Sequence, residues 1–310
     1  MKERLTTEEN EVPPHKETIC AVYVTYHPDA NLPERMGRIA RQVGHIVIVD
    51  NHSDEEAVHM LRALCQAENA ELIENKENLG IAAALNQGVT RAIELGYSWA
   101  LTLDQDSWPE PRLVDALDKI YASHPEREKV KMIGSNYILP ATGHMAFEPG
   151  STTPSFIETE CVITSGSLMS LKAFEEVGPF REDFFIDQVD DEYCLRLRSY
   201  GYKVLISSKP LMIHSCGNVS IRKHLWREVC SNHSPLRRYY ITRNRLILYR
   251  IYACKEPYWV KHSLRTMLGE IRLIILCEDR KIKKLLAILL GILHAILGRM
   301  GRIQNRILER

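Results

Sequence analysis

The sequence predicts an α/β fold: an open, mostly parallel sheet with helices on both faces, extended by a helical C-terminal region. Over the first hundred residues, short apolar runs alternate with stretches in which apolar residues recur at helical spacing. The connections are short, which is typical of a parallel sheet whose crossover helices cover both faces. From residue 236 onward the pattern is helical, so we expect a separate helical region there.

The apolar runs are the predicted strands. Five of them are compact, at residues 19–24, 45–49, 71–74, 99–103 and 131–139. Helical spacing lies between them at residues 32–43, 54–68, 81–95 and 110–123. A further strand at 161–169 is interrupted by small hydroxyl residues, and a helix with an acidic start follows near residue 187. One more strand ends at His214.

Polar residues follow the predicted strands at four places. These are Thr25 with Tyr26, Asp50 with Asn51, Asn78 with Gly80, and Asp104 with Asp106. In parallel sheets, ligands bind beyond the carboxyl ends of the strands, where such residues meet. Because all four clusters stand at the carboxyl ends of predicted strands, together they predict the rim of a nucleotide site. The sequence holds no Gly-x-Gly-x-x-Gly and no Gly-x-x-x-x-Gly-Lys segment, which argues against a dinucleotide fold or a P-loop.

The strand at 99–103 ends in two carboxylates, Asp104 and Asp106. Residues two apart in an extended chain point to the same side, so the two groups converge. They would repel each other and raise each other's pKa unless a cation lies nearby. Mg²⁺ and Mn²⁺ prefer carboxylate and phosphate oxygens, so this pair predicts a site for a metal and a diphosphate. The alternative is a solvated turn, because Asp-x-Asp-Ser is good turn chemistry.

Two further groups are candidates for chemistry. Four acids within six residues, at positions 187, 190, 191 and 192, lie at the start of a predicted helix. Acids at that end interact favourably with the helix dipole, which explains part of the pattern structurally and predicts a low pKa for Asp190. His214 stands at the end of a strand, where the alternatives are a metal ligand and a hydrogen-bonded structural residue.

The net charge of zero hides an asymmetry between the two parts of the chain. Residues 221–310 carry 20 Lys and Arg against 6 Asp and Glu, whereas residues 1–220 carry 20 against 34. A basic tail of this kind suggests an anionic partner. The eight cysteines are scattered without Cys-x-x-Cys spacing, which favours a reducing compartment. Residues 1–18 are polar, lack the pattern of a signal peptide and predict a disordered tail.

The end of the tail predicts an amphipathic helix. Apolar residues recur at helical spacing over 282–307, and Lys283, Lys284 and Arg302 occupy the other side. The apolar run at 285–297 is shorter than the ~20 residues of a spanning helix. We therefore expect a helix that lies in the membrane interface, with its basic side toward anionic lipid. The alternative is a helix docked on the body or in a homo-oligomer.

In this order and spacing, the motifs resemble the inverting family-2 glycosyltransferases of the GT-A fold, and most closely the bacterial rhamnosyltransferases that build surface polysaccharides. The matching segments are residues 24–28, 49–53, 78–82, 103–107, 187–196 and 238–244. The resemblance covers roughly residues 19–250. It implies a GT-A catalytic domain at 19–225, followed by a basic, amphipathic helical region at 226–310.

The resemblance also implies roles for single residues. Those expected to hold the nucleotide are Thr25, Tyr26, Asp50, Asn51, Asn78, Gly80 and Asp104, with Arg238 and Arg243 expected near the diphosphate. The implied ligands of Mg²⁺ or Mn²⁺ are Asp104, Asp106 and His214. The general base of the family falls on Asp190, with Asp191 and Glu192 as neighbouring candidates.

The implied reaction is metal-dependent transfer of a sugar with inversion. By the resemblance, the donor is dTDP-rhamnose, and galactofuranose or another hexose is the alternative sugar. The implied acceptor is a lipid-linked glycan at the cytoplasmic face of the cell membrane, a location that explains the basic tail.

Three other functions are open from the residues alone. A nucleotidyltransferase would usually carry a Gly-rich basic loop after the first strand, where this chain has Thr25-Tyr26-His27-Pro28-Asp29. A non-catalytic glycan- or nucleotide-binding module is disfavoured by the intact acids at 104, 106 and 190. Nucleic-acid binding is the weakest of the three, because the cations of the tail lie among aliphatic stripes and no known nucleic-acid motif is present.

Overall fold

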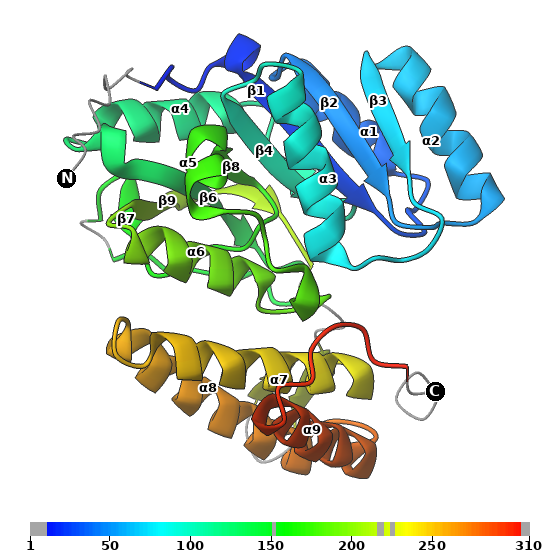
Figure 1. Cartoon of the computed structure of the whole chain (residues 1–310), viewed down its shortest axis with the longest axis vertical. Helices are drawn as coiled ribbons and strands as arrows, with labels where there is room; N and C mark the ends of the chain where they lie inside the picture. Colours follow the sequence, from blue (N-terminus) through cyan, green and yellow to red (C-terminus); the bar gives the residue numbers. More distant parts are fainter. Residues whose placement is uncertain (1–10, 151–152, 216–219, 224–226, 305–310) are drawn as a thin grey trace, which may run out of the picture.

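The computed structural model describes residues 11–150, 153–215, 220–223 and 227–304. It consists of an α/β body above a layer of C-terminal helices (Figure 1). The body strands are β1 (Ile19–Thr25), β2 (His45–Asp50), β3 (Ala70–Glu74), β4 (Trp99–Asp104), β5 (Trp108–Pro109), β6 (Val130–Ile138), β7 (Phe156–Glu158), β8 (Ser167–Ser170) and β9 (Lys203–Ile213). The body helices are α1 (Leu32–Ala40), α2 (Glu55–Ala67), α3 (Ile81–Glu94), α4 (Leu113–Ser123), α5 (Leu171–Val177) and α6 (Val189–Ser199).

The body strands form a mixed sheet in the order β3-β2-β1-β4-β8-β6-β9-β5, with β7 paired to β9. The first four strands of the chain run parallel, as the strand–helix alternation predicts. β8 is antiparallel to both of its neighbours, and β6 and β9 are parallel again. The register places Thr25 opposite Asp50 and Val24 opposite Asp104, so the carboxyl ends of β1, β2 and β4 meet at one edge.

The core lies on both faces of the sheet. On one face, Val22 of β1 belongs to a cluster with Leu85 of α3 and with residues of α5 and α6. On the other face, Tyr23 of β1 belongs to a cluster with Met36 of α1 and with residues of α2 and α4. Strands buried on both faces carry apolar residues without alternation, which explains the compact runs in the sequence.

Two sequence predictions about the body are wrong in part. Residues 11–18 are ordered rather than a disordered tail: Glu11 pairs with Lys131, and the indole N–H of Trp99 donates to the Val12 carbonyl at 2.7 Å. Residues 1–10 lie outside the described part of the chain. Of the strand predicted at 161–169, only the end pairs as β8, because Gly166 has a φ of +71° and turns the chain before it.

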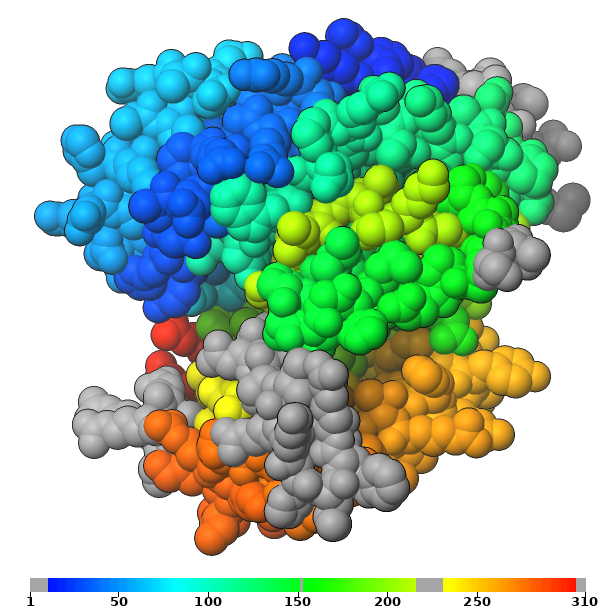
Figure 2. Space-filling model, turned by 180° about the vertical axis from the view of Figure 1, so that it is seen from behind, coloured from blue at the N-terminus to red at the C-terminus, as the bar shows by residue number. Residues whose placement is uncertain are grey.

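The predicted C-terminal region is helical, but it begins with strand structure. A hairpin of β10 (Ser220–Lys223) and β11 (Arg227–Cys230) precedes α7 (Pro235–Tyr252), α8 (Pro257–Leu276) and α9 (Lys281–Ile296). The predicted domain boundary at 225 and 226 falls outside the described residues. Figure 2 shows this region below the body from the opposite side. No helix in the described part of the chain is both long and apolar enough to cross a bilayer.

The last helix differs from its prediction in length and orientation. It ends at Ile296 instead of continuing to 307, and Gly298 and Gly301 follow with positive φ values. Residues 305–307 lie outside the described part. Lys284, predicted on a basic exposed side, is buried in an ion pair with Glu278. Of the predicted apolar stripe, the members on α9 from Ile282 to Ile296 are mostly exposed, whereas Met300 and Ile303 beyond it pack against buried clusters.

The contact between α7 and α9 depends on the absence of a side chain at Gly291. A Cβ at this position would lie 2.8 Å from the backbone carbonyl oxygen of Tyr239 and 3.2 Å from Cβ of Thr242. The backbones of the two helices therefore approach closely at this point, and α9 cannot accept a larger residue there without moving.

We expect Gly291→Ala to lower the free energy of unfolding by about 1–3 kcal/mol, because the new methyl group overpacks the helix contact. Gly269→Ala in α8 is the matched control, since a Cβ there has no neighbour within 4 Å. This control should gain up to about 1 kcal/mol from helix propensity. Urea denaturation measures both, and equal effects of the two substitutions would contradict the packing of α9 on α7.

Candidate active site

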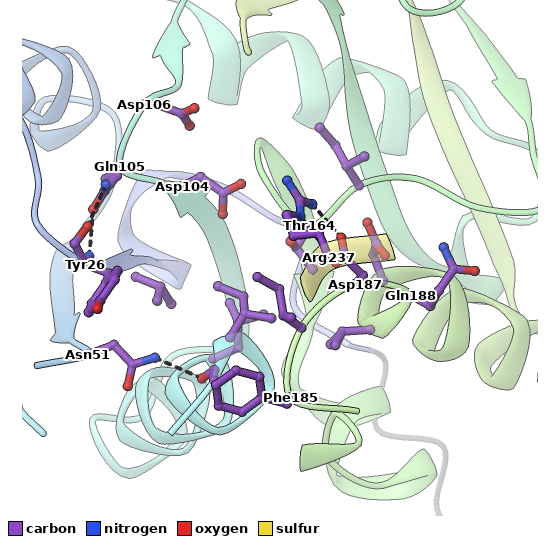
Figure 3. Close-up of a pocket in the computed structure, with 18 of the residues that line it drawn as sticks. Tyr26, Asn51, Asp104, Gln105, Asp106, Thr164, Phe185, Asp187, Gln188 and Arg237 are labelled. Atoms are coloured by element: carbon purple, nitrogen blue, oxygen red, sulfur yellow. Dashed lines mark hydrogen bonds and ion pairs between the residues drawn. The ribbon is translucent and has the colours of Figure 1, made fainter. Parts of the chain in front are cut away.

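A cavity of about 610 Å³ lies at the carboxyl edge of the sheet. The ends of β1 and β4, the loop before α3, the loop before α6 and the start of α7 all contribute to its wall. Figure 3 shows Tyr26 and Asn51 on one side of this cavity, Asp187 and Gln188 on the other, and Asp104 and Asp106 between them along the rim. The structure thus brings most of the predicted rim residues to one place.

The side of the cavity formed by β1 and β2 is built from paired polar groups. The Tyr26 N–H donates to Gln105 Oε1 at 2.7 Å, and the Gln105 amide returns a bond to the Tyr26 carbonyl at 3.0 Å. Asn51 donates to the Gly80 carbonyl at 3.1 Å and accepts from the Leu79 N–H at 2.9 Å. These bonds hold the two loops in place, while the Tyr26 ring remains half exposed and open to a ligand.

Asp50 does not line this cavity, although the sequence placed it at the rim. Its carboxylate is buried and accepts from the Thr25 hydroxyl at 3.0 Å and from the Ser53 N–H at 2.8 Å. Asp50 therefore lies beneath the surface and supports Thr25, which does line the cavity. Gln105, which the sequence interpretation passed over as the residue between two aspartates, is a lining residue instead.

The three predicted metal ligands converge. One ligand atom from each of Asp104, Asp106 and His214 lies within 4.8 Å of the others. His214 Nδ1 is 3.4 Å from Asp106 Oδ1, and His214 Nε2 is 3.9 Å from Asp104 Oδ2. The two carboxylates are ligands that Mn²⁺ and Mg²⁺ prefer, and the imidazole adds a nitrogen donor beside them. Residues 104 and 214 meet because β5, next to the end of β4, pairs with the end of β9.

Burial and the neighbouring charges shift the pKa of Asp104 in this cluster. Burial raises the pKa of Asp104, and the charge of Asp106 raises it further, while His214 partly offsets both effects. The His214 ring is nearly buried and is held through Nδ1 by a 2.8 Å hydrogen bond with the Ser107 hydroxyl. A cation between the three side chains would favour the ionised carboxylates.

The acidic residues 187–192 divide into two groups. Asp190 and Asp191 line the cavity, as does Asp187, which pairs with Arg237 at 2.5 Å. Burial, together with the negative charge of Asp191, raises the pKa of Asp190 to about 8. The predicted low pKa is therefore wrong, because desolvation outweighs the favourable field of the helix N-terminus.

Glu192 does not belong to the site. It is buried away from the cavity, where it pairs with Arg196 at 2.6 Å and accepts from the Tyr252 hydroxyl at 3.2 Å. On a helix, residue 192 points about 200° away from residue 190, so it faces the core when Asp190 faces the cavity.

The predicted arginines are also displaced from the site. Arg238 is buried between Glu270 and Glu278 at 2.9 and 2.8 Å, and Arg243 donates to backbone carbonyls. Neither lines the cavity, whereas Arg237, one residue earlier, does. One residue along a helix is a rotation of about 100°, which turns Arg237 to the cavity and Arg238 to α8.

Comparison with known proteins identifies the family. Residues 20–178, just over half of the chain, match the model described as Glycosyl transferase family 2. The chain belongs to this family. The expected resemblance is thereby confirmed, and the family-2 match rules against a nucleotidyltransferase.

This family-2 glycosyltransferase also resembles curated proteins along its sequence. It is 30% identical over 306 residues to the dTDP-rhamnosyl transferase RfbF of Shigella flexneri, covering 91% of this chain and 97% of that protein. It is 28% identical over 98 residues to the galactofuranosyltransferase GlfT1 of Mycolicibacterium smegmatis, covering 31% and 32% of the two chains.

Solved structures of glycosyltransferases share its fold. The S. aureus TarS 1–349 complex with UDP-GlcNAc has a TM-score of 0.57 at 14% identity, covering 90% of this chain and 81% of that one. The mannosyltransferase PcManGT of Pyrobaculum calidifontis, in complex with GDP-Man and Mn²⁺, has a TM-score of 0.56 at 13% identity, covering 93% and 90%. The predicted GT-A fold is confirmed by these neighbours.

The raised pKa of Asp190 has a consequence for stability. The pKa is about 8 in the folded chain and near 3.8 ordinarily, so between these values the folded state holds a proton that the unfolded state releases. Stability therefore falls as the pH rises from 4 to 8. We expect Asp190→Asn to raise the Tm at pH 8 by several degrees and to change it much less near pH 4, where the unfolded state also binds the proton in part.

Thermal denaturation of both proteins across this pH range measures the effect. Asp115→Asn on the exposed side of α4 is the control and should leave the Tm unchanged at both pH values. If Asp190→Asn raised the Tm by the same amount at every pH, the raised pKa of Asp190 would not be the cause of the effect.

Proposed function

We propose that this glycosyltransferase moves rhamnose from dTDP-rhamnose to a hydroxyl group of a lipid-linked glycan, with inversion at the anomeric carbon. The observation that carries the proposal is the meeting of Asp104, Asp106 and His214 with Asp190 and Asp191 around one cavity. The choice of donor is supported by the near full-length similarity to a dTDP-rhamnosyl transferase.

In this proposal, the donor nucleotide occupies the side of the cavity formed by β1 and β2. The half-exposed ring of Tyr26 offers a stacking surface for the base, and Thr25 and the loop from Asn78 to Gly80 border the nucleoside. The diphosphate extends toward Asp104 and Asp106. Arg237 faces the same space, so an incoming diphosphate competes with Asp187 for its guanidinium.

The three converging side chains would hold Mg²⁺ or Mn²⁺. When bound, the cation neutralises the negative charge that develops on the departing dTDP. Asp104, Asp106 and His214 would hold the cation on the donor side of the cavity, and the Ser107 hydroxyl fixes the orientation of the His214 ring through its bond to Nδ1. Such outer hydrogen bonds set the orientation of a metal-binding imidazole.

Asp190 is the proposed general base. The acceptor oxygen attacks the anomeric carbon and forms the new C–O bond, while the bond from that carbon to the phosphate oxygen breaks and its electron pair leaves with dTDP. The acceptor proton passes to a carboxylate oxygen of Asp190. A carboxylate with a raised pKa is a stronger base than one with the ordinary pKa, which favours this step.

We expect the transfer rate to rise with pH up to about 8, because Asp190 accepts a proton only after losing its own. Asp190→Asn should lower the transfer rate by about 10²–10⁴-fold, the usual contribution of a general base. Binding of dTDP, measured by calorimetry, should be unchanged in this variant. Transfer at the natural rate by Asp190→Asn would show that another group is the base.

The donor is tested with a panel of sugar nucleotides. Purified enzyme is incubated with dTDP-rhamnose, dTDP-glucose, UDP-galactofuranose or UDP-GlcNAc and a lipid-linked acceptor, with Mn²⁺ or with EDTA, and nucleoside diphosphate release is measured. We expect release from dTDP-rhamnose, abolished by EDTA and reduced at least about tenfold in Asp106→Asn. Preference for another donor, or full activity with EDTA, would overturn the respective part of the proposal.

The acceptor side of the proposal includes contact with the inner face of the cell membrane. The outer face of α9 exposes five large apolar side chains to solvent: Ile282, Leu286, Leu289, Leu293 and Ile296, which are 49–75% exposed. Exposed cations are also present on these two C-terminal helices: Lys261, Arg265 and Arg272 on α8, and Lys281 and Lys283 on α9. An exposed apolar stripe on a helical region that also exposes cations matches the chemistry of an anionic bilayer surface.

We expect the enzyme to sediment with vesicles that contain anionic phosphatidylglycerol, and less with neutral phosphatidylcholine vesicles. The double variant Leu286→Glu with Leu293→Glu should lose this binding, whereas Leu95→Glu, an exposed apolar residue next to α3, should retain it. Light scattering gives the oligomeric state in the same samples. A dimer that the double variant dissociates, without vesicle binding, would show that a second copy covers the stripe.

A further inference from the structure

The loop that leads into α6 has an unusual backbone. Phe185, Asp187 and Gln188 have φ values of 66°, 65° and 62°, in the left-handed region that residues other than glycine rarely adopt. Each such residue costs roughly 1–2 kcal/mol and persists only where the surroundings hold it. All three residues line the cavity, and Asp190 lies two residues after Gln188. Whatever holds the loop therefore sets the position of Asp190.

Asn244 of α7 is bonded to this loop through its side-chain amide. The Nδ2 group donates to the carbonyl oxygens of Phe184, Ile186 and Asp187, at 3.1, 3.0 and 2.9 Å. The side chain is completely buried, so water does not compete for these bonds. Its own Oδ1 accepts from Arg243 Nε at 2.9 Å, which fixes which end of the amide faces the loop.

Arg243 binds the beginning of the same loop. Its Nη2 group donates to the carbonyls of Asp183 and Phe184, both at 3.1 Å, and its Nη1 group donates to the Gly301 carbonyl at 2.6 Å. The guanidinium also lies 4.9 Å from the Tyr240 ring centroid. The buried guanidinium of Arg243 thus binds backbone carbonyls and aromatic rings rather than a carboxylate. Its hydrogen bonds therefore hold the backbone of the loop in place.

Helix α7 also binds a side chain of the loop, in addition to the loop backbone. Arg237, two turns before Asn244, pairs with the Asp187 carboxylate. The other side of the loop meets α3, where the Phe185 carbonyl accepts from the Ile81 N–H at 2.8 Å. The left-handed loop is therefore held between α7 and α3.

We infer that Asn244 and Arg243 are positioning residues for the base. They hold residues 184–188 in the left-handed path that places the start of α6, and with it Asp190, against the cavity. This role replaces the phosphate contact that the sequence suggested for Arg243. The inference rests on the proposed function in taking Asp190 as the base.

The test compares Asn244→Ala with Asn244→Ser, which retains one hydroxyl donor, and with the control Tyr249→Phe. The control removes a hydrogen bond between α7 and Ser263 of α8 that does not touch the loop. For Asn244→Ala we expect kcat to fall about 10–100-fold, since small displacements of a catalytic group have effects of this size. The KM for dTDP-rhamnose should change by less than about threefold, because the donor side is intact.

Two further measurements separate positioning from a merely structural role. In Asn244→Ala, the rise of kcat with pH should shift to lower pH, because water reaches Asp190 once the loop loosens. Amide hydrogen exchange should accelerate in the peptides that cover residues 183–190. Asn244→Ser should be intermediate in both, and Tyr249→Phe should match the natural enzyme.

Three results would overturn the inference: a loss of kcat proportional to the unfolded fraction, an unchanged pH profile, or unchanged exchange in residues 183–190. Failure of the natural enzyme to use any donor would instead count against the proposed function. The exchange experiment distinguishes the two, since it needs no substrate.

Discussion

The structure depends on bringing many negative charges to one edge of a sheet. Asp104 and Asp106 follow β4, and Asp187, Asp190 and Asp191 precede or begin α6, all around the same cavity. Like charges at this density destabilise a folded protein unless cations or protons compensate them. His214 and Arg237 supply part of the compensation, and a proton on Asp190 supplies more, at the cost of stability at higher pH.

Strand order is what makes this concentration of charge possible. β1 and β4 are parallel neighbours, and β8 inserts antiparallel between β4 and β6, so residues far apart in the chain reach a common edge. The loop before α6 then closes the cavity from the other side. The site is therefore assembled from three distant segments, each carried by a rigid element, with the strained loop held by α7.

Much of the fold and part of the site were predictable from the sequence. The parallel strands and their helices have strong local patterns, and the acids at 104 and 106 stand at a strand end, where direction is set by alternation. Contacts between distant segments were not predictable. Nothing local indicates that Arg237 rather than Arg238 faces the cavity, that Glu192 is buried against Arg196, or that Asn244 reaches a loop almost sixty residues earlier. The pKa of Asp190 was not predictable either. The position of this residue at a helix start can be read from the sequence, but its desolvation depends on the residues that surround it in the folded chain.

The contact at Gly80 has a consequence for how the enzyme distinguishes sugars. A Cβ at this position would lie 2.4 Å from the Phe185 carbonyl oxygen. The loop before α3 and the loop before α6 therefore touch through their backbones. The hydrogen bond from Ile81 to the same carbonyl joins them. The two walls of the cavity are thus joined at this point, beside the part of the cavity that the proposed function assigns to the nucleoside. In the proposed function, selectivity among hexoses of different shape then depends on the contours of the side chains that line the rest of the cavity, such as Thr164 and Ile186.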